Sequence, residues 1–164
     1  MISDEFEKYM SDALGLAQEA AADGEIPVGC VIVDAAGIII GKGRNTREKT
    51  RLATGHAEIA AIEEACRNLG DWRLNDCTAF VTLEPCPMCA GALINARIGT
   101  LVFGAREPVF GSVGSIIDLF SENFGVKTKV YSGVMEADCR RLTESFFKEK
   151  RLADKNIIKN QICE

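Results

Sequence analysis

An apolar strand is followed directly by a helix in the segment Val81-Thr82-Leu83-Glu84-Pro85-Cys86-Pro87-Met88-Cys89-Ala90-Gly91-Ala92, and this junction organises the rest of the chain. Residues 79–83 form a short apolar run with β-branched and aromatic members, which predicts the strand. Pro87 suits the first turn of a helix, because its φ angle is already helical and that turn needs no intrahelical N–H bond. We therefore expect a helix over residues 87–96 that begins at the two cysteines.

Apolar side chains at helical spacing predict the other helices of the chain. They cover residues 6–21, 57–69 and 136–155. Residues 104–114 are expected to form a loop, and residues 115–120 a short helix.

The strands are predicted by short runs rich in β-branched residues. Residues 28–33 and 38–40 form a hairpin around the turn at 34–37, and residues 100–103 and 129–131 give two further strands. Strands and helices thus alternate along the chain. This order predicts an α/β fold of three layers, in which a mixed five-stranded sheet carries helices on both faces.

The composition is that of an ordinary globular domain. The 164 residues are 47% hydrophobic and 26% charged, which excludes a disordered chain. We expect one domain over residues 1–164, with residues 152–164 as a helical extension or tail. No apolar run approaches the roughly 20 residues of a membrane helix, and the acidic start is unlike a signal peptide. A cytoplasmic protein is expected, in which the seven cysteines stay reduced and serve a metal or catalysis rather than disulfides.

The charge of the chain is distributed unevenly. The formal net charge is −5, which speaks against a uniformly basic surface for nucleic acid. Residues 1–139 hold 12 basic and 20 acidic side chains, whereas residues 140–160 hold 7 basic and 3 acidic ones. The last helix therefore presents either a basic face for a polyanion or an ordinary solvated surface, and both interpretations stay open.

Cys86 and Cys89 have the spacing of metal ligands. Three residues apart at the start of a helix, their thiols point to the same side, as a tetrahedral metal requires. The positive end of the helix favours the thiolate form that binds zinc. His56, the single histidine, precedes the helix at 57–69 and is expected to be the third ligand. Three protein ligands leave one zinc position for water, which is typical of catalytic sites.

Glu58 supplies the carboxylate that such a site needs to move protons between water and a substrate nitrogen. Residues two apart do not share a helix face, so spacing alone does not place Glu58 beside His56. Two other uses of the cysteine pair stay open. One is redox chemistry, and the other is a closed structural zinc site whose fourth ligand is Cys77, Cys66 or Cys30.

The segments His56-Ala57-Glu58 and Pro85-Cys86-Pro87-Met88-Cys89 resemble the zinc-dependent cytidine and deoxycytidylate deaminase superfamily. Other segments are similar to its bacterial tRNA-specific adenosine deaminases: Ile26-Pro27-Val28-Gly29, Trp72-Arg73-Leu74 and Ala96-Arg97-Ile98-Gly99. The resemblance covers about residues 6–151. It implies the cytidine-deaminase-like form of the three-layer fold and a homodimer.

The resemblance also assigns roles to individual residues. It implies one zinc ion per subunit on His56, Cys86 and Cys89, with Glu58 as the catalytic proton carrier. It places Asn45, Val28 and the backbone of Ala57 around the bound base. The implied reaction is hydrolysis at C6 of the wobble adenosine in a tRNA anticodon loop, with release of ammonia and formation of inosine.

The chain departs from the tRNA-deaminase pattern where that family contacts RNA. Glu107 stands in place of an aspartate and Val109 in place of a frequent lysine, and Gly125-Val126 replaces an Asn-His pair. These changes remove hydrogen bonds of the kind that read a splayed RNA loop. Glu107 remains a candidate for substrate contact, as does Phe147, whose ring is suited to stacking on a base.

Three functions are therefore weighed for this sequence. The first is deamination of adenosine in tRNA. The second is deamination of a free nucleobase, nucleoside or related small amino-heterocycle such as guanine. The third is a zinc-stabilised interaction domain without catalysis, which the presence of Glu58 disfavours.

Overall fold

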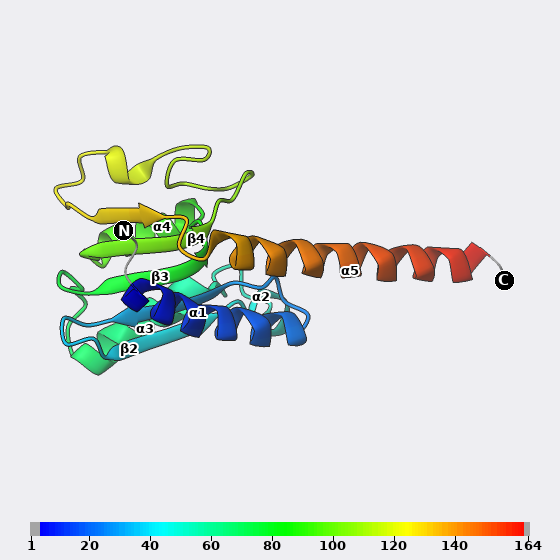
Figure 1. Ribbon diagram of the computed structural model, residues 1–164, viewed down its shortest axis with the longest axis horizontal. Coiled ribbons are helices and arrows are strands. Elements are labelled where there is room, and N and C mark those ends of the chain that lie inside the picture. Colours follow the sequence, from blue (N-terminus) through cyan, green and yellow to red (C-terminus); the bar gives the residue numbers. More distant parts are fainter. Residues whose placement is uncertain (1–3, 163–164) are drawn as a thin grey trace.

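A computed structural model describes the backbone of residues 4–162 and the side chains of residues 4–155. A five-stranded sheet in the order β2-β1-β3-β4-β5 forms its centre (Figure 1). The strands are β1 (Gly29–Val33), β2 (Ile39–Arg44), β3 (Thr78–Leu83), β4 (Thr100–Ala105) and β5 (Lys129–Ser132). β1 runs antiparallel to β2 and to β3, whereas β3, β4 and β5 are parallel. The predicted mixed sheet is confirmed.

Helices cover both faces of the sheet. The helical elements are α1 (Asp4–Ala22), α2 (Arg47–Thr50), α3 (Ala57–Leu69), α4 (Pro87–Asn95), the 3-10 turn η1 (Leu119–Ser121) and α5 (Glu136–Ile162). α1 and the first part of α5 pack on one face, and α3 and α4 pack on the other (Figure 1). The molecule thus has the three layers that the sequence predicts.

The central strands are apolar on both sides, because both of their faces are covered. All five residues of β1 are buried. Cys30 and Ile32 point into the core beneath α3 and α4, whereas Val31 and Val33 point into the core beneath α1 and α5. Alternate residues of this short strand therefore contribute side chains to two separate hydrophobic cores, one on each face of the sheet.

Glycines allow two helices to lie directly against the sheet. A Cβ atom on Gly43 would overlap the carbonyl oxygen of Ala57, and one on Gly41 would overlap that of Ala61. Gly29 meets the backbone of α1 in the same way. Only a residue without a side chain permits such an approach. The first turn of α3, which follows His56, is thereby held close to β2.

The segment between β4 and β5 differs from its prediction. Residues 115–120 do not form a short helix, and the one helical turn described here is η1. Gly114 has a φ angle of +120°, and Val113 pairs with Asp118 in an isolated antiparallel bridge. The amide group of Gly114 donates to the carbonyl oxygen of Ile117, and that of Leu119 donates to the carbonyl oxygen of Ser112, so the backbone here follows a non-helical hydrogen-bond pattern.

The last helix is longer than predicted. The sequence indicates an end near residue 155, but α5 continues to Ile162 through the stretch expected to be a helical extension or tail. Its C-terminal half projects away from the rest of the molecule (Figure 1), and residues 147–155 are all exposed. Among the described helices, none is long and apolar enough to cross a bilayer.

Candidate zinc and substrate site

The three predicted metal ligands lie at the beginnings of two neighbouring helices. His56 immediately precedes α3, Cys86 immediately precedes α4, and Cys89 lies in the first turn of α4. Because α3 and α4 pack against each other, these positions meet. The ligand atoms of the three residues all lie within 4.8 Å of one another.

The geometry of this cluster fits a zinc ion. Nδ1 of His56 lies 3.7 Å from Sγ of Cys86 and 3.5 Å from Sγ of Cys89. A tetrahedral ion with usual Zn–N and Zn–S bond lengths separates such ligand atoms by about 3.6 Å. One imidazole and two thiols are also the donor types that zinc prefers. The three side chains therefore form a zinc site with one position left for a non-protein ligand.

The two thiols differ in acidity before any metal binds. A hydrogen bond from Cys89 lowers the pKa of Cys86 to about 4, so this thiol ionises readily. The same hydrogen bond raises the pKa of Cys89, because the pair shares one proton. Zinc binding replaces that proton, since both sulfurs bind a metal as thiolates.

The closed site with four protein ligands is not formed. Among the described side chains, the cluster that is able to hold a metal contains His56, Cys86 and Cys89 alone. The alternative fourth ligands, which are Cys30, Cys66 and Cys77, are not part of it. This result favours the open site that hydrolytic zinc enzymes use.

Glu58 lies beside the zinc ligands, a placement that its spacing from His56 alone did not establish. It is in the first turn of α3, its residue is only 4% exposed, and it lines the same pocket as His56 and Cys86. Burial raises the pKa of Glu58 above its usual range. A carboxyl group with a raised pKa is able to take up and release a proton near neutral pH.

Asn45 presents an unused acceptor next to this centre. Its Nδ2 donates to the carbonyl oxygen of Ile26 at 3.3 Å, which fixes the amide group in one orientation. Its Oδ1 is buried and, among the described residues, is the only buried side-chain polar atom without a hydrogen-bond partner. Buried polar atoms are nearly always paired in folded proteins. The orphaned oxygen therefore indicates a ligand that brings a donor.

A pocket of about 520 Å³ encloses these groups. Of the five predicted substrate-contact residues, it contains four: Val28, Asn45, Ala57 and Glu107. The predicted site residues did not include the other residues that line the pocket, which are Ile26, Arg47, Ala53, Leu83, Glu84, Pro87, Met88 and Phe110. Ile26 and Met88 belong to the quoted motif segments, so their position in those motifs was the available signal. Phe110 is an aromatic residue in a loop and carried no comparable signal.

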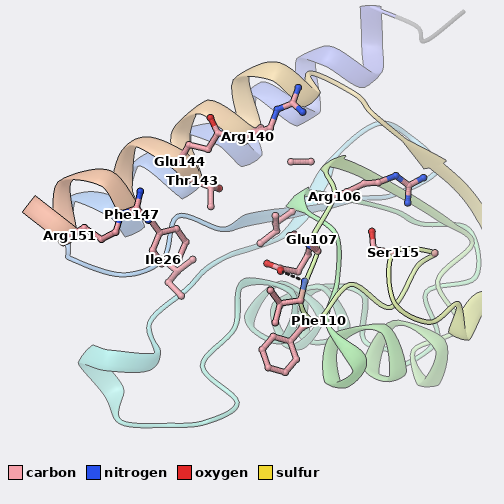
Figure 2. Close-up of a pocket in the computed structure, with 15 residues that line it drawn as sticks. Ile26, Arg106, Glu107, Phe110, Ser115, Arg140, Thr143, Glu144, Phe147 and Arg151 are labelled. Carbon is pink, nitrogen blue, oxygen red and sulfur yellow. Dashed lines mark hydrogen bonds between the residues drawn. The ribbon is translucent and has the colours of Figure 1, made fainter.

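A second, larger hollow of about 1040 Å³ adjoins the zinc pocket and shares Ile26, Leu83, Glu107 and Phe110 with it. Figure 2 shows α5 along one side of this groove and the loop that carries Glu107 and Phe110 opposite. Phe147, the fifth predicted residue, lines the groove and not the zinc pocket. Arg106, Arg140 and Arg151 add positive charge to its walls. The groove thus leads from the buried centre to the basic part of α5.

The turn that carries Arg47 into the zinc pocket is fixed by another buried carboxylate. Glu25 is 1% exposed and accepts the amide groups of Glu48 at 3.1 Å and Lys49 at 2.8 Å. These hydrogen bonds hold α2 against the loop that precedes β1. The position of Arg47 is therefore set by a side chain more than 20 residues earlier in the sequence.

The comparison with known proteins agrees with this geometry. Residues 3–105 match the family described as the cytidine and deoxycytidylate deaminase zinc-binding region. The chain belongs to this family. The zinc-dependent deaminase resemblance predicted from the sequence is thereby confirmed.

Individual relatives cover the chain to different extents. The tRNA-specific adenosine deaminase of Bacillus subtilis is 43% identical over 155 residues, which are 94% of this chain and 96% of that protein. The tRNA(Ile)-lysidine synthase of Deinococcus radiodurans is 46% identical over 149 residues, or 91% of this chain, but the chain spans only 26% of that longer protein. A solved structure from work on A-to-I editing by tRNA:A34 deaminases has a TM-score of 0.78 and 39% identity. That match covers 82% of this chain and 98% of the other.

Proposed function

We propose that this protein is a zinc-dependent hydrolase that converts adenosine to inosine at the wobble position of tRNA. The observation that carries the proposal is the buried, unpartnered Oδ1 of Asn45, which shares a pocket with Glu58 and with the zinc ligands His56 and Cys86. A purine with an exocyclic amino group brings N–H donors to such an acceptor. The tRNA-specific adenosine deaminase relatives, which match nearly the whole chain, support the choice of substrate.

Different residues of the pocket bind the metal, orient the base and exclude water during hydrolysis. Zinc, when bound, supplies a Lewis acid that makes water a nucleophile near neutral pH. Asn45 accepts a hydrogen bond from the base, and Ala57, at the start of α3, has an amide group without an intrahelical partner to offer it. These contacts orient C6 of the base towards the zinc ligands. Val28 forms part of the apolar wall that excludes bulk water.

Glu58 moves the protons of the reaction. Its carboxylate takes a proton from the attacking water and delivers it to the ring nitrogen next to C6. Glu58 then takes the proton of the hydroxyl group now attached to C6 and delivers it to the amino group, which makes that group a good leaving group. The bond between C6 and the amino nitrogen then breaks, ammonia departs, and the carbonyl group of inosine remains. Burial of Glu58 keeps its pKa suited to both directions of transfer.

The adjoining groove favours a nucleic acid over a free base as the substrate. A volume of about 1040 Å³ beyond the zinc pocket exceeds what a single heterocycle fills. Phe147 offers a ring for stacking, and Arg151 lies one helical turn away to contact a phosphate. Oε1 of Glu107 accepts a hydrogen bond from the amide group of Val109 at 2.8 Å. These two residues, which differ from the tRNA-deaminase pattern, therefore shape the wall of the groove together.

We also propose that the domain spans the whole chain, acts in the cytoplasm and forms a homodimer. Exposed apolar side chains gather in the segment between β4 and β5, which is typical of a protein–protein contact. They are Val109, Phe110, Ile116, Ile117 and Phe124. Light scattering of the purified protein tests the dimer, and a monomer at micromolar concentration would contradict it.

The function is tested by incubating zinc-loaded protein with an anticodon stem-loop that carries adenosine at the wobble position. We expect inosine at that position, and none in the same RNA with the adenosine moved into the stem. Free adenosine, guanine, cytosine and a pterin form a parallel panel assayed for ammonia. Ammonia from one of these compounds without inosine in the RNA would favour the small-molecule alternative. No product in either arm, with zinc bound, would favour the non-catalytic alternative.

A further inference from the structure

Glu84 is a buried carboxylate that the chemistry described above does not use. It follows the last residue of β3 and is 2% exposed. A charged side chain is rarely buried to this extent unless it is paired or well hydrogen-bonded. No basic side chain forms an ion pair with it among the described residues. Its partners are instead found in one loop.

The loop from Glu107 to Ser115 is wrapped around this carboxylate. Oε1 of Glu84 accepts the amide groups of Val113 at 2.9 Å and Ser115 at 3.0 Å. Oε2 accepts the amide group of Glu107 at 3.1 Å and the hydroxyl group of Ser115. Four donors thus converge on two oxygens. A Cβ atom on Gly111 would overlap the carboxylate, so the backbone there lies directly against it.

The same loop forms the wall between the zinc pocket and the groove. Glu107 and Phe110 line both cavities. Phe110 is 64% exposed, so its position depends on the backbone that carries it and not on packing in a core. The amide group of Gly111 donates to the carbonyl oxygen of Glu107, which links the two lining residues to the part of the loop that Glu84 binds.

We propose that Glu84 is a positioning residue that holds the loop from Glu107 to Ser115 in its substrate-binding form. Although Glu84 borders the zinc pocket, both of its oxygens are occupied by donors of the loop, and so it acts through Glu107 and Phe110 rather than on the reacting atoms. Its contribution is therefore to substrate binding rather than to the chemical step. The part of the proposal that concerns RNA rests on the function proposed above.

The test compares Glu84→Gln with the wild-type holoenzyme. Glutamine has nearly the same volume, but it replaces one acceptor oxygen with an NH₂ group that faces backbone donors. We expect hydrogen–deuterium exchange of the peptide covering residues 107–115 to be roughly 10-fold faster, because hydrogen bonds to a charged acceptor are lost. KM for the anticodon stem-loop is expected to rise roughly 10-fold, with kcat within a factor of about three of the wild-type value and zinc content unchanged.

Two further variants make the result specific. Ser115→Ala removes one of the four donors and is expected to show the same pattern at smaller amplitude, which keeps the test available if Glu84→Gln does not fold. Asp34→Asn is the matched control. Asp34 also accepts hydrogen bonds from two backbone amides, those of Ala36 and Ile38, but it lies in the turn between β1 and β2 and outside both cavities. This variant is expected to leave both KM and the exchange of residues 107–115 unchanged.

The outcomes separate this proposal from the one on function. Unchanged exchange of residues 107–115 in Glu84→Gln would overturn the positioning role whatever the substrate is. A fall in kcat together with loss of zinc, at unchanged KM, would also overturn it, because Glu84 would then act through the neighbouring Cys86. Faster exchange in a protein whose wild type leaves the RNA unmodified would support the loop assignment and reject the tRNA substrate.

Discussion

The two halves of the substrate site are built in different ways. The zinc half consists of side chains at the starts of α3 and α4, two helices packed against each other and against the sheet. The other half consists of the loop between β4 and β5 and the exposed face of α5. The first is held by regular secondary structure and buried apolar contacts. In the second, α5 packs on the sheet only through its first part, and the loop is held largely by hydrogen bonds to one carboxylate.

This difference separates chemistry from recognition. Groups that handle the metal and the protons need positions fixed to within a fraction of an ångström, which packed helices supply. Groups that accept a polymer need a surface that differs between relatives without disturbing those positions, which loops supply. Changes at Glu107 and Val109 therefore alter the wall of the groove while His56, Glu58, Cys86 and Cys89 keep their arrangement.

The largest effect is expected from Cys86→Ser, which breaks the zinc half. Zinc content should fall from about one ion per chain to a small fraction of that value, deamination should disappear, and Tm should drop, because metal binding contributes to folding stability. Metal analysis and thermal unfolding measure these changes. Chelator-treated wild type should reach the Tm of the variant. Cys66→Ser, at a half-buried cysteine outside the cluster, is the control and should keep its zinc.

Glu58→Gln tests whether the zinc half performs chemistry beyond binding the metal. We expect kcat to fall by roughly 10²- to 10⁴-fold, because the proton carrier is lost, while zinc content and affinity for the stem-loop stay near wild type. Single-turnover formation of inosine gives the rate. Glu64→Gln alters a half-buried carboxylate of the same helix, one that accepts a hydrogen bond from the amide group of Lys42, and should retain full activity. A residual rate within threefold of wild type in Glu58→Gln would contradict the assigned role.

Asn45→Ala tests how the zinc pocket binds the base. Without the Oδ1 acceptor, the donor of the bound base is left unpaired, and we expect kcat/KM to fall by roughly 10-fold or more. Steady-state kinetics on the stem-loop provide the measurement. Asn68→Ala offers a close comparison, since Asn68 also donates from Nδ2 to a backbone carbonyl, that of Ile40, away from the pocket. Equal kinetics in the two variants would remove Asn45 from the binding site.

The smallest effect is expected in the recognition half, from Phe147→Ala. Loss of one stacking ring should weaken RNA affinity by roughly 10-fold, with little change in the rate of single turnovers at saturating RNA. Equilibrium binding of a labelled stem-loop tests this. Leu152→Ala, at an exposed residue of the same helix that does not line the groove, should bind like wild type. An unchanged Kd for Phe147→Ala would leave the groove without its proposed stacking contact.

The zinc half and the loop half differ in how well the sequence predicts them. The difference depends on whether the contacts that build each half join residues close together or far apart in the sequence. The spacing of Cys86 and Cys89 at a helix start is a local pattern, and so the ligands were predicted without knowledge of the fold. The position of Glu58 beside Cys89 could not be predicted from a local pattern, because it depends on how α3 packs against α4. Its prediction needed the family resemblance.

The loop half was the least predictable. The hydrogen bonds that shape it join Glu84 to residues 23 to 31 positions later, and no local periodicity reports them. Without them, the apolar residues at 115–120 read as a short helix, which is where the prediction was wrong. The long helices and the other strands were predicted well, because hydrophobic periodicity reflects the faces they bury. The strand predicted at 38–40 instead runs from Ile39 to Arg44, because Gly41 and Gly43 carry no hydrophobic signal in the sequence.

The close approach of α3 to Gly41 and Gly43 has a consequence for the zinc site. Main-chain atoms have no alternative rotamers, so the spacing between this helix and its strand is fixed by contacts that do not relax when neighbouring side chains change. The position of the His56 imidazole is set by this spacing, because His56 immediately precedes α3. A methyl group added at either glycine would therefore shift the histidine as a whole, and no rearrangement of surrounding side chains would restore it.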